Sequence, residues 1–309
     1  MIPFRSDMLS TPSPRLSSYT APRLQTTPSV RAKIIAFVNQ KGGTGKTTIS
    51  QNVAACLAMV HSKNVLCVDL DPQGNLGQGM ISDPINVTKT ADRMLLVPKP
   101  RVSEYIIPLR PGLDLIPNRY QKDLHDNVEK MPYQTNLLRE RLDIILPHYD
   151  FVILDTPAGL GVPTRVAIEA ADEVVIVMSC GMYALRGTAA VLEGIDELFS
   201  SSRRKPPVLR VILNNFDDRR RFDRGFRREA AKLFGDKLFE TYIRTNIRIA
   251  EAAAHSQAVI EYQETCLGAT DFKRLSREML GLPAVENVFE DEHSNQRIQG
   301  NARVFRLVS

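Results

Sequence analysis

The chain has 309 residues, 43% of them hydrophobic, with 40 Lys and Arg against 35 Asp and Glu. This length and composition suffice for one large α/β domain with its own core, or for two small ones, and we favour one. No apolar stretch approaches the ~18 residues that a membrane span requires, and no signal-peptide h-region is visible, so we expect no stable membrane insertion.

Both ends of the chain differ in composition from the middle. Residues 1–30 are rich in Ser, Thr and Pro and lack apolar periodicity, which predicts a disordered N-terminal arm. This acid-poor segment could instead be an organelle transit peptide, although its prolines would interrupt an amphipathic helix. We expect one folded domain over residues 31–281 and a flexible C-terminal tail over 282–309, which carries the acidic patch Glu290-Asp291-Glu292.

The middle of the chain alternates short apolar runs with segments of helical spacing. The expected strands are Ile34–Val38, Val65–Asp69, Phe151–Asp155, Val174–Ser179, Leu209–Asn214 and a shorter one over Leu238–Ile243. The expected helices include Thr48–Val60, Thr188–Phe199 and Arg228–Phe234. Near-continuous apolar strands between helices predict a mostly parallel, doubly wound α/β sheet with helices on both faces. Ligands then bind at the carboxyl ends of the strands.

A glycine-rich loop follows the first expected strand and precedes a helix that we expect to begin near Lys46. The general phosphate-loop pattern G-x-x-x-x-G-K-[ST] requires glycine at position 40, but the chain has Gln40 there and a second lysine, Lys41, next to it. Backbone N–H groups of such a loop, the helix N-terminus and a lysine all favour phosphate. We therefore predict nucleotide binding by Lys41, Gly42, Gly43, Thr44, Gly45, Lys46, Thr47 and Thr48.

Acidic residues stand at the ends of two other expected strands. Asp69 and Asp71 follow the apolar run that begins at Val65, and Asp155 ends the run that begins at Phe151. A carboxylate at the end of a buried strand is costly unless it meets a cation or hydrogen-bond donors, and Mg²⁺ with its waters supplies both. The alternative is that one of these acids, above all Asp69, merely caps a turn.

Four motifs together resemble those of the ParA/Soj partition ATPases, within the ParA/MinD group of deviant Walker A ATPases. They are Lys41 before the loop glycines, the D-L-D-P-Q-G-N block at 69–75, the D-T-P-A-G-L-G block at 155–161 and the stretch Ile243–Ala252. The resemblance covers about residues 31–281. It implies a P-loop fold, ATP and Mg²⁺ as ligands, and a slow, switch-type ATPase that moves DNA.

The resemblance also implies roles for individual residues. Lys41, Lys46 and Asp71 would be catalytic, with Lys41 reaching the nucleotide of the other subunit and Asp71 orienting the attacking water. Mg²⁺ would be held, partly through water, by Thr47, Asp71 and Asp155. Asn214 falls where the family contacts adenine, although Asn215 is adjacent. Arg244 stands where the family usually has proline.

The region from Arg203 to Arg248 is strongly basic. It contains 14 Lys or Arg and 6 Asp or Glu, a local excess of eight. A solvated helix face is one interpretation, and a sequence-nonspecific DNA-binding face is the other. For the second we expect contacts from Arg219, Arg220, Arg221, Arg224, Arg227, Arg228, Arg244 and Arg248.

The expected partners follow from this family resemblance. They are a second copy of the chain in the presence of ATP, nonspecific double-stranded DNA and a centromere-binding ParB-like protein, in the cytoplasm at the nucleoid. Alternatives are a MinD-like ATPase that positions itself on a membrane surface, and a ParA-like ATPase that positions a protein cargo. An iron–sulfur reductase of the nitrogenase-iron-protein type would need two cluster cysteines in a Gly-rich loop, which none of the four cysteines provides.

Overall fold

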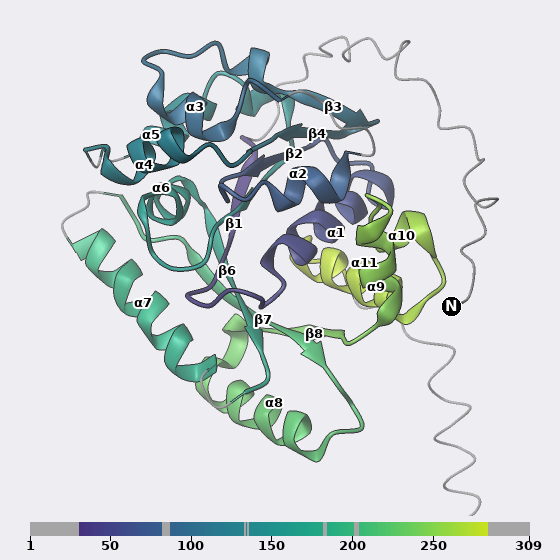
Figure 1. Cartoon of the computed structure of the whole chain (residues 1–309). Coiled ribbons are helices and arrows are strands. Elements are labelled where there is room, and N and C mark those ends of the chain that lie inside the picture. Colours follow the sequence, from purple (N-terminus) through teal and green to yellow (C-terminus); the bar gives the residue numbers. More distant parts are fainter. Residues whose placement is uncertain are drawn as a thin grey trace, which may run out of the picture.

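The computed structural model describes residues 31–81, 87–132, 134, 136–181, 184–200 and 204–283. The expected N-terminal arm and all but two residues of the expected tail lie outside these ranges. The described residues form an eight-stranded sheet in the order β3-β4-β2-β5-β1-β6-β7-β8 (Figure 1). Its strands are β1 (Lys33–Val38), β2 (Val65–Asp69), β3 (Ile107–Arg110), β4 (Leu113–Ile116), β5 (Phe151–Asp155), β6 (Glu173–Ser179), β7 (Val208–Phe216) and β8 (Leu238–Arg244).

All neighbouring strands are parallel except the β3–β4 pair, which is antiparallel. The doubly wound, mostly parallel sheet predicted from the sequence is therefore confirmed, and each of the six expected strands exists within one or two residues of its expected bounds. The hairpin of β3 and β4 at the edge of the sheet was not expected.

Helices cover both faces of the sheet. They are α1 (Lys46–Met59), α2 (Asn75–Met80), α3 (Ala91–Leu96), α4 (Lys122–Lys130), α5 (Leu137–Leu142), α6 (Val162–Ala170), α7 (Ala184–Ser200), α8 (Arg221–Phe234), α9 (Ile247–Ala254), α10 (Val259–Tyr262) and α11 (Leu267–Met279), with short 3₁₀ turns η2 (Val102–Tyr105), η3 (Leu146–His148) and η4 (Gly235–Lys237).

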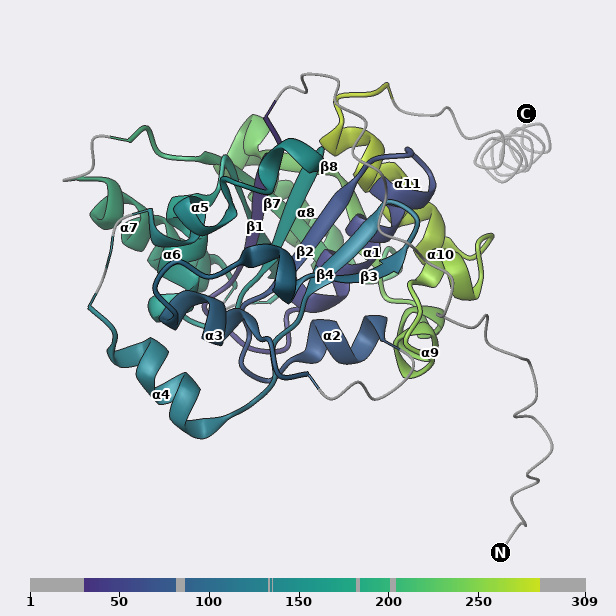
Figure 2. The same ribbon diagram turned by 90° about the horizontal axis from the view of Figure 1, so that it is seen from above.

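The central strand β1 shows why there are two helical layers. Its side chains alternate between the two faces of the sheet, as in any strand. Ile34 and Ala36 join the core beneath α3 to α8, whereas Ile35 and Phe37 join the core beneath α1, α2 and α9 to α11. Viewed from above, the strands lie between these two layers (Figure 2). All the residues of β1 except Lys33 are buried, which explains its continuous apolar sequence.

Strand β8 lies at the edge of the sheet, and side chains from both helical layers bind its backbone. The Glu278 carboxylate of α11 accepts hydrogen bonds from the backbone N–H groups of Glu240, at 2.7 Å, and Thr241, at 2.9 Å. From the other face, the Arg227 guanidinium of α8 donates to the Glu240 carbonyl at 3.0 Å. Two backbone donors and one acceptor near the middle of this edge strand are thus occupied from within the chain.

Candidate nucleotide site

The loop between β1 and α1 starts at a buried polar residue. The side-chain amide of Asn39 donates to the Val177 carbonyl of β6, and its Oδ1 accepts the backbone N–H of Lys41 at 2.9 Å. Asn39 thus ties the start of the loop to the neighbouring strand. Sequence analysis did not single out Asn39, although a polar residue directly after a buried strand is a recognisable signal.

The glycine before α1 is required by its surroundings. Gly45 has a φ of 87°, in the left-handed region, and a Cβ there would lie 2.1 Å from Nδ2 of Asn214. That nitrogen donates to the Thr44 carbonyl at 2.7 Å. Of the two adjacent asparagines, Asn214 is thus the one that contacts the loop, while Asn215 is exposed with a φ of 55°. An adenine contact by Asn214 stays a prediction.

Asp155 at the end of β5 is held by two hydroxyl groups of α1. Thr47 Oγ1 donates to Asp155 Oδ2 at 2.7 Å, and Ser50 Oγ donates to Asp155 Oδ1 at 2.9 Å. Thr47 and Asp155, both predicted to hold Mg²⁺, are therefore in direct contact. Ser50 was missed by the sequence analysis, although it lies three residues after Thr47 and hence on the same side of the helix.

Asp155 and Asp69 are direct register partners on neighbouring strands, and neither has solvent-exposed surface. Burial is the main cause that raises both pKa values, that of Asp155 to about 6; repulsion from Asp155 further raises the pKa of Asp69. Asp69 accepts the backbone N–H groups of Asp71, Leu76 and Gly77 at 3.1 to 3.2 Å. Asp69 therefore caps the turn that leads into α2, which is the alternative left open for it.

Lys46 brings positive charge to these acids. It is 7% exposed; burial lowers its pKa, while the charges of Asp155 and Asp71 raise it. Asp71 is half-buried, and its Oδ1 accepts the backbone N–H of Gln73 at 2.9 Å. The structure thus gathers Lys46, Thr47, Asp71 and Asp155 at the carboxyl ends of β1, β2 and β5.

This arrangement fits a magnesium nucleotide. Gly42 and Gly43 are exposed, and no atom lies within 4 Å of where a Cβ would stand on either. The buried hydroxyl of Thr44 has no hydrogen-bond partner in the described part of the chain. Hydroxyl and carboxylate oxygens are the ligands that Mg²⁺ prefers, together with water and phosphate oxygens. Among the described residues no group of three His, Cys, Asp or Glu side chains could hold a metal ion by itself.

The arginines predicted to bind DNA fall into two groups on opposite faces of the sheet. Arg219 and Arg220 precede α8 and pair with Asp217, and Arg221 begins that helix. Arg248, at the start of α9, pairs with Glu251 and is 45% exposed. Both groups follow the carboxyl ends of the adjacent strands β7 and β8, where the Thr245 N–H donates to the Phe216 carbonyl at 3.0 Å.

Arg244 differs from the other predicted DNA contacts. Its backbone N–H and Nε both donate to Asp271 Oδ2 at 3.0 Å, and one terminal nitrogen donates to Asp271 Oδ1 at 2.6 Å. The side chain of Asp271 is 3% exposed and that of Arg244 is 20% exposed. A guanidinium held this way joins β8 to α11 inside the fold, which argues against this part of the DNA-binding prediction.

The doubly wound sheet, the glycine loop between β1 and α1, and the lysine, threonine and acids around it define a P-loop ATPase. The AAA domain family model matches residues 32–206. The chain is 33% identical to the sporulation initiation inhibitor protein Soj of Bacillus subtilis, over 80% of this chain and 98% of that one. It is 30% identical to the chromosome partitioning protein ParA of Caulobacter vibrioides, over 80% and 94%. The chain therefore belongs to the ParA/Soj family of partition ATPases.

Solved structures share the fold. The septum site-determining protein MinD of Pyrococcus horikoshii, complexed with Mg-ADP, aligns with a TM-score of 0.67 at 24% identity, over 80% of this chain and 96% of that one. McdA of Cyanothece, in complex with ATP, aligns with a TM-score of 0.71 at 19% identity, over 84% and 100%. The described part of the chain contains no helix long and apolar enough to cross a membrane.

Proposed function

We propose that this chain is a DNA-partition ATPase that closes into a two-fold dimer around two ATP molecules, binds DNA without sequence preference in that state, and is reset by hydrolysis. The observation that carries the proposal is the difference in exposure between the two lysines of the loop. Lys46 is buried among the acids, whereas Lys41 is exposed at the other end of the same loop, beside Gly42 and Gly43.

This difference in exposure supports a role for Lys41 across a subunit interface. A buried lysine next to Thr47 is suited to the phosphates bound in its own subunit. A lysine on the outer surface of the loop is suited to the phosphates of a second nucleotide that faces it. In such a dimer the nucleotide is part of the interface, so ATP would close the dimer and loss of the outer phosphate would open it.

The residues of the site suit slow phosphoryl transfer to water. Mg²⁺, when bound, neutralises phosphate charge. Lys46 would bind the outer phosphates, and Thr47 and Asp155 would hold the metal, with Ser50 fixing the second oxygen of Asp155. Asp71 would orient the attacking water, while its Oδ1 is kept in place by the Gln73 N–H. The protein therefore contributes positioning and charge compensation, and little covalent chemistry.

For DNA we propose a face built around the carboxyl ends of β7 and β8. Arg219 and Arg220 are 89% and 70% exposed, and Arg248 stands at the start of the helix that follows β8. Further contacts along α8 would come from Arg221, Arg224, Arg227 and Arg228. Exposed arginines without a pattern of base-reading side chains favour phosphate contacts, which carry no sequence information.

Fluorescence anisotropy with two unrelated duplexes tests this function. If each subunit of the ATP dimer neutralises about four phosphates, the log–log salt slope is about −7, and affinity falls roughly 10⁴-fold between 50 and 200 mM salt. Binding should be strong with ATP and weak with ADP, and equal for the two duplexes. Equal DNA affinity with ADP, or DNA binding insensitive to salt, would contradict the proposal. The arginines would then be interpreted as a solvated helix face that does not bind DNA.

A ParB-like partner and a location at the nucleoid are part of the same proposal. The partner would be recognised by its effect, which is faster hydrolysis when DNA is also present. The MinD-like alternative differs in a simple measurement, because flotation with anionic lipid vesicles would carry the protein upward only if it binds membranes.

A further inference from the structure

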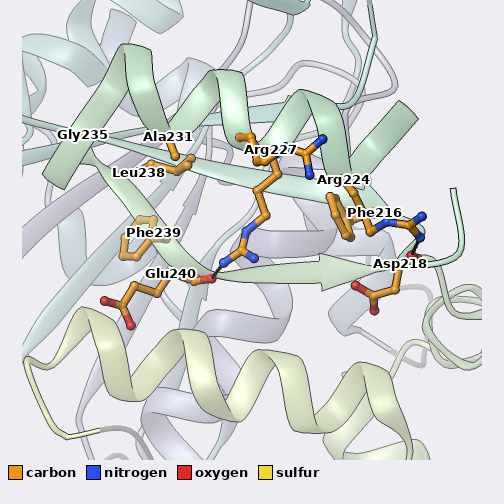
Figure 3. A pocket seen from close by; sticks show the side chains of 10 residues that line it. Phe216, Asp218, Arg224, Arg227, Ala231, Gly235, Leu238, Phe239 and Glu240 are labelled. Atoms are coloured by element: carbon orange, nitrogen blue, oxygen red, sulfur yellow. Dashed lines mark hydrogen bonds between the residues drawn. The ribbon is translucent and has the colours of Figure 1, made fainter. Parts of the chain in front are cut away.

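A pocket lies between α8 and the edge strand β8, away from the nucleotide loop. It has a volume of about 450 Å³. Arg224, Arg227 and Arg228 line the pocket, and Leu238 and Ala231 supply apolar surface. Figure 3 shows Arg224, Arg227 and Ala231 on α8, and Leu238 at the start of β8. A pocket with guanidinium groups beside apolar surface suits a ligand that carries both carboxylates and apolar side chains.

The charges around the pocket leave it net positive. Arg227 donates to the Glu240 carbonyl and lies over the Tyr242 ring, and Arg224 donates to the Asp218 carbonyl. The two acids that line the pocket are Asp218, which accepts the Tyr242 hydroxyl at 2.7 Å, and Glu240. The side chain of Arg228 is exposed and makes no ion pair or hydrogen bond with the described residues, so its donors are available to an incoming carboxylate.

A segment of the same chain has the complementary composition. Residues 284–293 read A-V-E-N-V-F-E-D-E-H, with four acids and no Lys or Arg. Within it Val288 and Phe289 directly precede Glu290, Asp291 and Glu292. An apolar pair followed by three carboxylates matches a pocket of apolar surface bordered by three guanidinium groups.

This segment leaves the described structure close to the pocket. Glu278 in the last turn of α11 binds the backbone N–H of the pocket residue Glu240 at 2.7 Å. The described chain ends five residues later at Pro283, whose carbonyl is held by Arg277 at 3.0 Å. From Pro283 to Glu290 is seven residues, which can span up to about 25 Å when extended. The reach is therefore sufficient for Phe289 and the acids to enter the pocket from the side of Glu240.

We propose that the acidic segment 284–293 docks in the pocket between α8 and β8 and covers Arg224 and Arg228. Resting on the proposed DNA-binding function, the consequence is competition between this segment and DNA for the same guanidinium groups. The segment thereby acts as a built-in DNA mimic that weakens nonspecific binding until two subunits present their arginines together.

Cross-linking in the full-length chain tests the docking without DNA. We would pair Ala231→Cys, on the pocket wall, with Asn287→Cys in the segment, and use Ala231→Cys with Asn301→Cys as the matched control. Docking predicts that the first pair forms an intramolecular disulfide at least about tenfold faster than the control. Adding Glu290→Gln, Asp291→Asn and Glu292→Gln to the first pair should slow it to the control rate. A first pair no faster than the control would overturn the proposal.

DNA anisotropy with ATP then tests the competition. Neutralising Glu290, Asp291 and Glu292 should tighten nonspecific DNA binding about tenfold at 50 mM salt, because their three carboxylates no longer compete with phosphates for Arg224 and Arg228. Neutralising Arg297, Arg303 and Arg306 in the same tail should not tighten it. Fast cross-linking with unchanged DNA affinity would overturn the competition. Fast cross-linking in a chain that binds no DNA would overturn the DNA-binding function and leave the docking standing.

Discussion

Asp69 and Asp155 stand side by side at the ends of β2 and β5 with both carboxylates fully buried. Their sites differ in the donors that face them. Asp69 receives backbone N–H groups, which fix a turn, whereas Asp155 receives two hydroxyl groups and the charge of Lys46. Asp155 is therefore the carboxylate that we propose as the metal ligand, because the hydroxyl groups and Lys46 that face it belong to the nucleotide loop and α1.

This pair predicts the pH dependence of nucleotide binding. Burial raises the pKa of Asp155 to about 6, above the ~3.9 of an unfolded aspartate. Between these values the folded protein holds a proton that the unfolded chain has released, so the stability of the unliganded protein falls as pH rises from about 4 to about 6. Because Mg²⁺ requires the ionised carboxylate, Mg-ATP affinity should fall about tenfold per pH unit below about 6.

Titration with a fluorescent ATP analogue across this pH range measures the effect. Ser50→Ala removes a hydrogen bond that lowers the pKa of Asp155, so the midpoint should move to higher pH. The nucleotide's own phosphate titrates identically with the Asp155→Asn variant. This variant should therefore lose only the part of the pH dependence that Asp155 causes. A midpoint unchanged in both variants would mean that another group sets the pH dependence.

The two loop lysines should separate nucleotide binding from dimerisation. Lys46→Ala should abolish tight ATP binding, because it removes the buried charge beside Asp155. Lys41→Ala should leave ATP binding by the monomer measurable and prevent the ATP-dependent dimer. Light scattering with ATP and Mg²⁺ gives the mass of each variant, and an intact dimer in Lys41→Ala would contradict the cross-subunit role.

Asp71 should affect turnover more than binding. If its carboxylate orients water, Asp71→Ala should lose on the order of 10²-fold in turnover, about 3 kcal/mol in barrier, and still bind ATP. The ATP-bound dimer should then accumulate. Phosphate release under single-turnover conditions measures the step, and wild-type rates would make Asp71 a structural residue of the turn before α2.

Substitutions of Arg244 and Arg248 can be compared to separate a structural role from a DNA-binding role. Arg244→Ala leaves the Asp271 carboxylate buried and unpaired, so the free energy of unfolding should fall by about 3 kcal/mol. Arg248→Ala breaks an exposed pair with Glu251 and should cost less than about 1 kcal/mol. Urea denaturation measures both.

DNA affinity should follow the opposite order at these two positions. Arg248→Ala should weaken nonspecific binding, while Arg244→Ala should leave it unchanged under conditions where the variant is folded. Comparable stability losses in the two variants would contradict the structural role assigned to Arg244.

Much of the fold could be predicted because the central strands are fully buried. Val65–Asp69 and Phe151–Asp155 have the expected bounds, since each buried apolar run ends at an acid. The β3–β4 hairpin was missed because Pro108 and Arg110 interrupt the first run and Asp114 the second. Short edge strands need less apolar sequence than central ones, so their periodicity is weak.

The candidate site was predictable where chemistry depends on neighbours in sequence. The residues from Lys41 to Thr48 are contiguous, so the phosphate-loop motif can be recognised directly in the sequence. Ser50 and Asn39 were missed because their contacts, with Asp155 and Val177, depend on which strands are neighbours in the sheet. Similarly, α8 begins at Arg221, seven residues before the expected start at Arg228. The start was missed because the first turns contain few apolar residues; only Asp223 and Phe226 are buried there.

The occupied backbone groups of β8 have a consequence if many copies of the chain gather on DNA, as we propose. An open parallel sheet ends in a strand that can template another strand, and crowding of identical chains would favour such growth. Glu278 and Arg227 deny incoming chains the hydrogen bonds of Glu240 and Thr241. In the proposed dimer, crowded copies would then meet through the nucleotide loop without growing into fibrils from this edge, and their assembly would stay reversible.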